Sequence, residues 1–160
     1  MKVLKFGGTS VGSAQRMKEV AALIADGQQK IVVLSAMSGT TNTLVEIADY
    51  LYKKNPVSAN EVINQLEKKY AAVIDELYST DNFKAQATAC VKQNFELLRN
   101  FTKQNVFLLF DEKIILAQGE LMSTAMVNLY LQEIGRKSVL LPALDYMRID
   151  KNNEPDAAYI

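Results

Sequence analysis

The feature that most limits the possible folds is a long segment without glycine. From Thr40 to Gln118 the chain contains no glycine and a single proline, Pro56. Glycine and proline most often end helices or form tight turns, so a long stretch without them favours extended helices. The other parts of the chain place their glycines in short turns. The sequence therefore predicts a mostly helical middle bounded by glycine turns.

Apolar residues recur at helical spacing within this middle segment and also before it. Two further helical pieces are expected, one on each side of Gly119. The four remaining apolar faces are Met17, Val20, Ala21 and Ile24; Leu44, Ile47, Ala48, Leu51 and Tyr52; Val62, Leu66, Tyr70, Val73 and Leu77; and Phe83, Ala87, Cys90 or Val91, Phe95 and Leu98.

Three short apolar segments are typical of β-strands. The first opens the chain, "KIVVLS" spans 30–35, and "KSVLLPAL" spans 137–144. The second is a nearly continuous run of β-branched residues, which favours a strand covered on both faces. Strands that alternate with helical crossovers predict an α/β fold, with α/β/α layers and a mainly parallel sheet.

Composition excludes several classes of function. Eighteen basic residues balance eighteen acidic ones, so no nucleic-acid partner is expected. The longest apolar runs are too short to cross a bilayer, so no membrane association is expected. The single cysteine, Cys90, excludes an internal disulfide and fits a reducing cytoplasm. The chain has no histidine, which removes the usual general base and the commonest metal ligand, and no metal site is predicted.

The opening stretch "KVLKFGGTSVGSAQRM" has the order strand, glycine turn, helix start. A dinucleotide-binding turn needs a third-position glycine, where Thr9 stands, and an acidic residue at the end of the second strand, where Ser35 stands. A Walker-type loop needs a lysine directly after its second glycine, and Ser13 follows Gly12 instead. Neither phosphate-binding design fits this stretch.

A different arrangement preserves the same physical logic. Gly7 and Gly8 allow a close backbone approach, and successive amide groups there form an anion-binding concavity. The helix that follows adds partial positive charge at its N-terminus. Lys5 precedes the turn on the strand, where its ammonium group is expected to stabilise a phosphoryl group during transfer.

Three segments resemble the motifs of aspartate kinases, which belong to the amino-acid kinase superfamily. "KFGGTSVGSAQRM" is similar to their N-terminal signature, "VLSAMSGTTNTL" to the second motif, and "AQGELMSTAMVNLYL" to the third. The motifs occur in the family's order and extend to about position 131. Related kinases for uridylate, glutamate or acetylglutamate share the lysine and the glycine turn, but usually not the "TSVG" that follows here.

The resemblance implies transfer of the γ-phosphoryl group of ATP, with Mg²⁺ in the substrate complex, to the side-chain carboxylate of L-aspartate. The product is 4-phospho-L-aspartate, at the start of lysine, threonine and methionine biosynthesis. A carboxylate with a pKa of about 3.9 is already ionised at neutral pH, so the nucleophile needs no general base. Such a reaction suits a chain without histidine.

The resemblance also implies roles for individual residues. Lys5 takes the catalytic role of stabilising the phosphoryl group. Gly7 and Gly8 offer amide groups to the phosphates of ATP. Thr9 and Ser10 match the polar residues that complete this phosphate cradle.

Three residues match positions that contact the amino-acid substrate in the family. Ser35 and Thr41 belong to the second motif, although Thr41 is equally suited to be a helix N-cap. Glu120 matches the acidic residue that binds the substrate's ammonium group. It stands beside an apolar helical face, so we expect it to be shielded from solvent.

The family's later arginine-glycine-glycine-serine-aspartate motif, its adenine-binding half and its regulatory ACT domains are not found in residues 1–160. The resemblance therefore predicts the N-terminal portion of a catalytic domain, inactive by itself and expected to form homo-oligomers. Two alternatives stay open: a kinase for another small carboxylate, and a non-catalytic binding or regulatory module.

Overall fold

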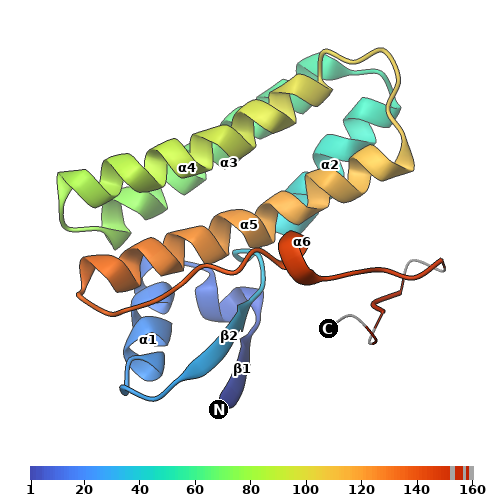
Figure 1. The fold of residues 1–160 in the computed structure, drawn as a ribbon. Coiled ribbons are helices and arrows are strands. Elements are labelled where there is room, and N and C mark those ends of the chain that lie inside the picture. Colours follow the sequence, from blue (N-terminus) through green and yellow to red (C-terminus); the bar gives the residue numbers. More distant parts are fainter. Residues whose placement is uncertain (152–153, 157, 159–160) are drawn as a thin grey trace.

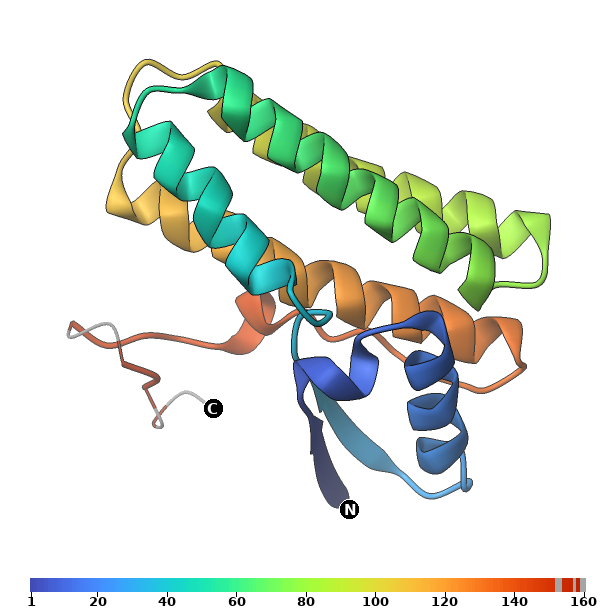
Figure 2. The ribbon, with the colours of Figure 1, turned by 180° about the vertical axis from the view of Figure 1, so that it is seen from behind.

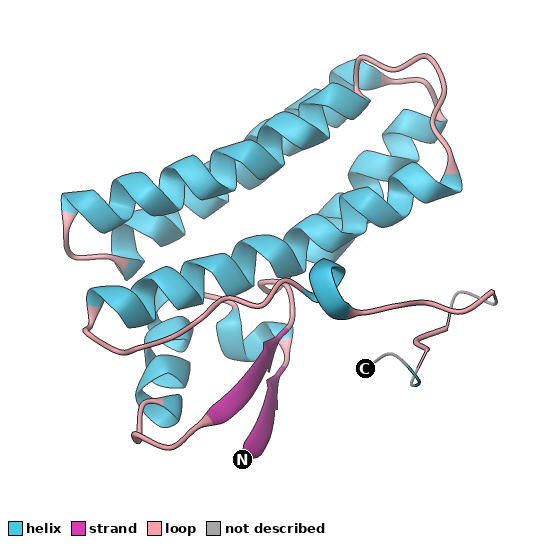
Figure 3. Cartoon of the chain, viewed as in Figure 1, coloured by secondary structure: helices cyan, strands magenta, loops and turns pink. Residues whose placement is uncertain are grey.

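The computed structural model describes residues 1–151, 154–156 and 158. Helices make up most of this part of the chain, and Figure 3 shows the strands together at one side. In chain order the elements are β1 (Lys2–Phe6), the short 3₁₀ helix η1 (Gly8–Val11), α1 (Ala14–Ile24), β2 (Lys30–Leu34), α2 (Thr40–Tyr52), α3 (Pro56–Leu77), α4 (Asp81–Phe101), α5 (Leu109–Glu133) and α6 (Ala143–Tyr146).

The N-terminal part of the fold, up to Leu34, is a β-α-β unit. Strands β1 and β2 pair in parallel, and α1 forms the crossover between them. Successive side chains of a strand point to opposite faces, so Leu4 and Phe6 pack against the core while Lys5 lies on the other face. The predicted α/β fold with a parallel sheet is confirmed.

The second face of this sheet differs from the expectation. Strand β2 was expected to be covered on both sides, but Ile31 and Val33 are 40% and 44% exposed, and Val3 beside them on β1 is 64% exposed. The reason is that the described helices cover the sheet from one side alone. The apolar run of β2 therefore predicted the strand correctly. It predicted burial correctly for one face of the strand and wrongly for the other.

The long helices form layers over the β-α-β unit (Figure 1). Helices α3 and α4 lie side by side as the outermost pair, and α2 and α5 lie between that pair and the sheet, as the reverse view also shows (Figure 2). Tyr70 of α3 and Phe95 of α4 are fully buried and meet edge to face, with ring centroids 5.7 Å apart. Most residues of the predicted apolar faces are buried or half-buried, but Tyr52, which was assigned to the face of α2, is 44% exposed at the end of that helix.

Helix α5 is continuous, whereas two pieces flanking Gly119 were predicted. It contacts α1, α2, α4 and β2, so apolar residues are needed on all of its sides rather than on one face. By length and composition, α5 is the one helix in the described ranges that could cross a membrane. Its place at the centre of the packing, with Gln118 and Ser123 buried in it, accounts for the same composition.

The third predicted strand is wrong. Residues 137–142 run as a loop along α5, and 143–146 form the short helix α6. Val139 and Leu141 are 82% and 65% exposed. A strand is stabilised by hydrogen bonds to a neighbour, and this segment pairs with neither β1 nor β2. High β-propensity without a partner strand is not sufficient to form one.

Candidate functional site

A cleft with a largely polar lining lies where β1 and β2 end and the chain turns into helices. In parallel α/β sheets, ligands bind at this carboxyl edge of the strands. The cleft has a volume of about 400 Å³. Its lining comes from both turns and from α5: Gly8, Thr9, Ser35, Ala36, Met37, Ser38, Gly39, Thr41, Asn42 and Glu120.

Five of the predicted site residues line this cleft together: Gly8, Thr9, Ser35, Thr41 and Glu120. They come from three separate parts of the sequence, each part containing one of the three motifs. The geometry thus brings together the residues that were expected to contact the phosphates and those that were expected to contact the amino acid.

The turn after β1 is closely packed against the turn after β2. A β-carbon on Gly8 would lie 2.8 Å from the carbonyl oxygen of Ala36, so only glycine fits there. A β-carbon on Gly7 would meet nothing within 4 Å, and the φ of Gly7 is −78°, a value open to any residue. Packing therefore explains why position 8 requires glycine. Packing places no such requirement on position 7, where the space beside the backbone is open.

The turn after β2 leads directly into α2. Gly39 has φ +79°, in the left-handed region that favours glycine, and it stands at the N-cap without a side-chain hydrogen bond. Thr41 was considered as an N-cap, and this reading is wrong because the helix already begins at Thr40. Among the described residues, the N–H groups of Thr41 and Asn42 have no hydrogen-bond acceptor.

Glu120 reaches the cleft from the middle of α5. One carboxylate oxygen, Oε1, accepts a hydrogen bond from the amide of Ala36 at 3.3 Å. The preceding Gly119 permits this approach, because a β-carbon there would lie 2.7 Å from the β-carbon of Ala36. Glu120 was expected to be shielded from solvent, but it is exposed where it faces the open cleft. Its charge is therefore accessible to a ligand.

Ser35 is held by the neighbouring turn of α5. The hydroxyl of Ser123 donates a hydrogen bond of 2.8 Å to the carbonyl oxygen of Ser35, and Ser123 itself is buried. The Ser35 side chain has no recorded hydrogen bond within the described part of the chain. The backbone is thus fixed while the hydroxyl remains available.

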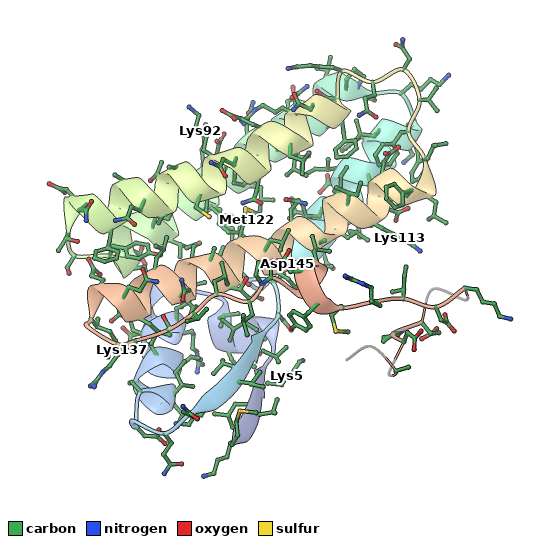
Figure 4. All side chains as sticks on the ribbon, in the orientation of Figure 1. Lys5, Lys92, Lys113, Met122, Lys137 and Asp145 are labelled. Carbon is green, nitrogen blue, oxygen red and sulfur yellow. The ribbon has the colours of Figure 1, made fainter. Side chains whose placement is uncertain are left out.

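The remaining predicted residues lie next to the cleft rather than in its lining. Lys5 is exposed on the face of β1 that points away from the core (Figure 4), opposite Val33 in register. Gly7 and Ser10 flank the lining residues of the first turn, where the Ser10 amide donates to the Gly7 carbonyl at 2.9 Å. Lys5 is not among the residues that line the cleft.

Sequence reasoning missed the contributions of Asn42 and Tyr70. Asn42 follows Thr41 in the second motif, so its place beside a predicted site residue was the available signal. Tyr70 was assigned to a core face only. Its hydroxyl shares a 3.2 Å hydrogen bond with the buried hydroxyl of Thr40. Burial raises the pKa of Tyr70 to about 12, opposed by the Thr40 hydrogen bond and assisted by the Glu120 carboxylate. Tyr70 is therefore a neutral hydroxyl beneath the cleft.

Comparisons with known proteins show the family to which the chain is similar. Residues 1–158 match the model of the amino acid kinase family. Aspartokinase 2 of Arabidopsis thaliana chloroplasts is 34% identical over 143 residues, which cover 85% of this chain and 25% of the relative. The bifunctional aspartokinase/homoserine dehydrogenase of Buchnera aphidicola is 31% identical over 142 residues, which cover 82% of this chain and 17% of the relative.

Solved structures show the same similarity. E. coli aspartokinase III in complex with aspartate and ADP superposes with a TM-score of 0.82 at 26% identity, covering 99% of this chain and 35% of that chain. The same enzyme in complex with lysine and aspartate gives a TM-score of 0.80. This chain spans about a quarter of the length of the first curated relatives it matches. The chain belongs to the amino acid kinase family.

Proposed function

We propose that residues 1–160 form the N-terminal portion of an aspartate kinase catalytic domain, which transfers the γ-phosphoryl group of ATP to the side-chain carboxylate of L-aspartate. The observation that carries the proposal is one cleft that gathers Gly8, Thr9, Ser35, Thr41 and Glu120. Support comes from the similar structures of E. coli aspartokinase III, which were solved with aspartate, one of them also with ADP.

The substrate end of the cleft has the charge pattern that an amino acid requires. The free N–H groups of Thr41 and Asn42 lie in the first turn of α2, where the helix dipole favours a negative group. We assign the α-carboxylate of aspartate to these groups and to the Ser35 hydroxyl. Glu120 offers a carboxylate in the lining of the same cleft, and we assign the substrate ammonium group to it.

The phosphate end is built from the turn after β1. Gly8 and Thr9 line the cleft, and the open space beside Gly7 leaves room for phosphate oxygens close to the backbone. Lys5 lies on β1 just before this turn. We propose that its ammonium group stabilises the negative charge that develops on the phosphoryl group during transfer.

Mg²⁺ fits this site as a part of the ATP complex. Glu120 is the one carboxylate in the cleft lining, and within the described ranges no group of three metal-binding side chains is found. Magnesium commonly uses substrate phosphate oxygens and water for most of its ligands. We therefore assign no residue of this chain as a metal ligand.

The reaction needs positioning and charge neutralisation from these residues, and no proton transfer. The β-carboxylate of aspartate is ionised at neutral pH and attacks the γ-phosphorus, the bond to the ADP oxygen breaks, and the negative charge leaves on ADP. Holding the two reactants in line accounts for a large part of the rate in such reactions.

The test uses the full-length protein with Mg²⁺, ATP and aspartate, and traps the acyl phosphate as its hydroxamate. We expect aspartate to be phosphorylated in preference to glutamate and N-acetylglutamate. Glu120→Gln should raise the aspartate concentration for half-maximal rate about tenfold, because a charged hydrogen bond is worth roughly 1.5 kcal/mol. The requirement for ATP should change little.

Glu46→Gln is the matched control, because Glu46 is exposed on α2 outside the cleft lining. Preference for another carboxylate would assign the chain to a different kinase of the family. Absence of any acyl phosphate from the full-length protein would point to a binding or regulatory module. Equal effects of Glu120→Gln on aspartate and ATP would contradict its role at the ammonium group.

The location and assembly of the protein stay predictions. Chloroplastic enzymes are among the relatives, and the prediction of a cytoplasmic protein rests on the single cysteine. Size-exclusion chromatography with light scattering would test the predicted homo-oligomer directly.

A further inference from the structure

Helix α3 contacts the turn between β2 and α2 through two consecutive residues. The Lys69 ammonium group donates a 2.7 Å hydrogen bond to the carbonyl oxygen of Ser38. The next residue, Tyr70, shares its hydroxyl with Thr40 at 3.2 Å. These two contacts lie on either side of Gly39, so they hold the chain just before and just after the glycine at the start of α2.

Contacts from α5 hold the first part of this turn, at Ser35 and Ala36, whereas those from α3 act farther along, at Ser38 and Thr40. Gly39 caps α2 and has no side chain, so it contributes no side-chain contact that would hold this turn. The Thr40 amide donates to the Met37 carbonyl, which closes the turn but does not attach it to another element. The contacts from α3 attach Ser38 and Thr40 to a helix that itself packs against α1, α2 and α4.

Lys69 also places a positive charge beside the cleft. Its Nζ lies 3.5 Å from the position of a β-carbon on Gly39, and Ser38 and Gly39 both line the cleft. Lys69 forms no ion pair with another residue of the described chain. Its charge is therefore compensated only by the Ser38 carbonyl dipole and by solvent, or by an anionic ligand.

We propose that Lys69 is a positioning residue that holds the Ser38–Gly39 turn from α3 and thereby aims the N–H groups of Thr41 and Asn42 into the cleft. Tyr70 supports the same turn from the other side of Gly39. On the proposed function, on which this inference rests, the consequence falls on aspartate binding. The nucleotide should be much less affected, because its phosphates are assigned to the turn after β1.

The experiment compares Lys69→Met with Lys68→Met in the full-length protein. Lys68 is the adjacent exposed lysine of α3 and has no recorded contact with a side chain or carbonyl of the described residues. Methionine is unbranched, one atom shorter than lysine, and lacks the charged donor. Hydrogen–deuterium exchange of residues 36–43 reports on the turn, and hydroxamate kinetics report on the substrates.

We expect Lys69→Met to speed amide exchange in 36–43 and to raise the aspartate concentration for half-maximal rate about three- to tenfold, the effect of losing one charged hydrogen bond at an exposed site. The ATP requirement and the maximal rate should stay near wild type. Lys69→Arg, which can still donate to Ser38, should recover most of the loss. Tyr70→Phe should reproduce the faster exchange, because it removes the hydroxyl and keeps the ring against Phe95.

Two results would overturn the inference. In one, Lys69→Met behaves like Lys68→Met in both measurements. In the other, exchange in 36–43 becomes faster while aspartate and ATP requirements change equally. If the wild-type protein forms no hydroxamate from aspartate, the proposed function fails separately, and the exchange comparison alone decides whether Lys69 holds the turn.

Discussion

A methyl group added at position 119 should push α5 away from the turn that contains Ala36. In Gly119→Ala the added β-carbon would lie 2.7 Å from the β-carbon of Ala36 and 3.2 Å from Cγ2 of Thr40. Carbon atoms pack best at about 3.5–4.0 Å, and neither neighbour is the end of a flexible side chain. The substitution must therefore displace α5 or the turn that holds Ala36.

Two opposing effects set the size of the change. Replacing glycine by alanine inside a helix stabilises it by about 1 kcal/mol. Forcing an extra methyl group into a packed site costs about 1–3 kcal/mol, and a contact this short belongs at the upper end. The expected net loss is about 2 kcal/mol, which lowers the melting temperature by roughly 4–8 °C for a chain of this size.

The measurement is thermal unfolding of the chain, followed by far-UV circular dichroism. Combining Gly119→Ala with Ala36→Gly removes the opposing β-carbon, so the double variant should be more stable than the sum of the two single changes by about 1 kcal/mol or more. Strict additivity, or a Gly119→Ala variant more stable than wild type, would show that the close approach of α5 to Ala36 does not exist.

Two further predictions concern charged groups. Lys5→Ala should lower turnover of the full-length kinase by orders of magnitude and leave unfolding nearly unchanged, because Lys5 is exposed on β1; near-normal turnover, as expected for the control Lys2→Ala, would remove its catalytic role. Glu133 accepts hydrogen bonds from the Thr80 and Ser79 amides at the start of α4. Partial burial would raise the pKa of Glu133, but these hydrogen bonds outweigh burial and lower it. Its contribution to stability is therefore complete above the unfolded-state pKa of about 4.3 and is lost as the pH falls below that value. In urea titrations Glu133→Gln should be less stable at neutral pH and lose less stability than wild type on acidification, and parallel pH profiles would contradict this.

The sequence predicted the elements whose formation depends on local pattern. The helical faces around Leu44, Leu66 and Phe95 are buried, because periodic apolar residues define a face whatever covers it. The segment 137–142 failed for the opposite reason, since a strand needs a partner that propensity cannot supply. Gly119 was taken as a break between helices, although its small size serves the contact with Ala36.

The sequence predicted those site residues that lie in the three quoted motifs. Ser35, Thr41 and Glu120 stand in quoted motifs and meet in the cleft. Lys69 and Tyr70 lie outside every motif, although their partners Ser38 and Thr40 belong to the second one. A contact between a helix and a distant turn leaves no spacing pattern in either segment, so only the folded arrangement could reveal it.

The hydrogen bond between Ala36 and Glu120 also bears on the order of folding. It joins residues 84 positions apart, whereas α2, α3 and α4 each contact the next helix in sequence. Because local contacts cost less loop-closure entropy, we expect the helical hairpins to form early and the cleft to close late. In pulse-labelled refolding, the Ala36 amide should become protected after the amides within α3 and α4. Simultaneous protection would mean that the two walls of the cleft meet before the helices between them are complete.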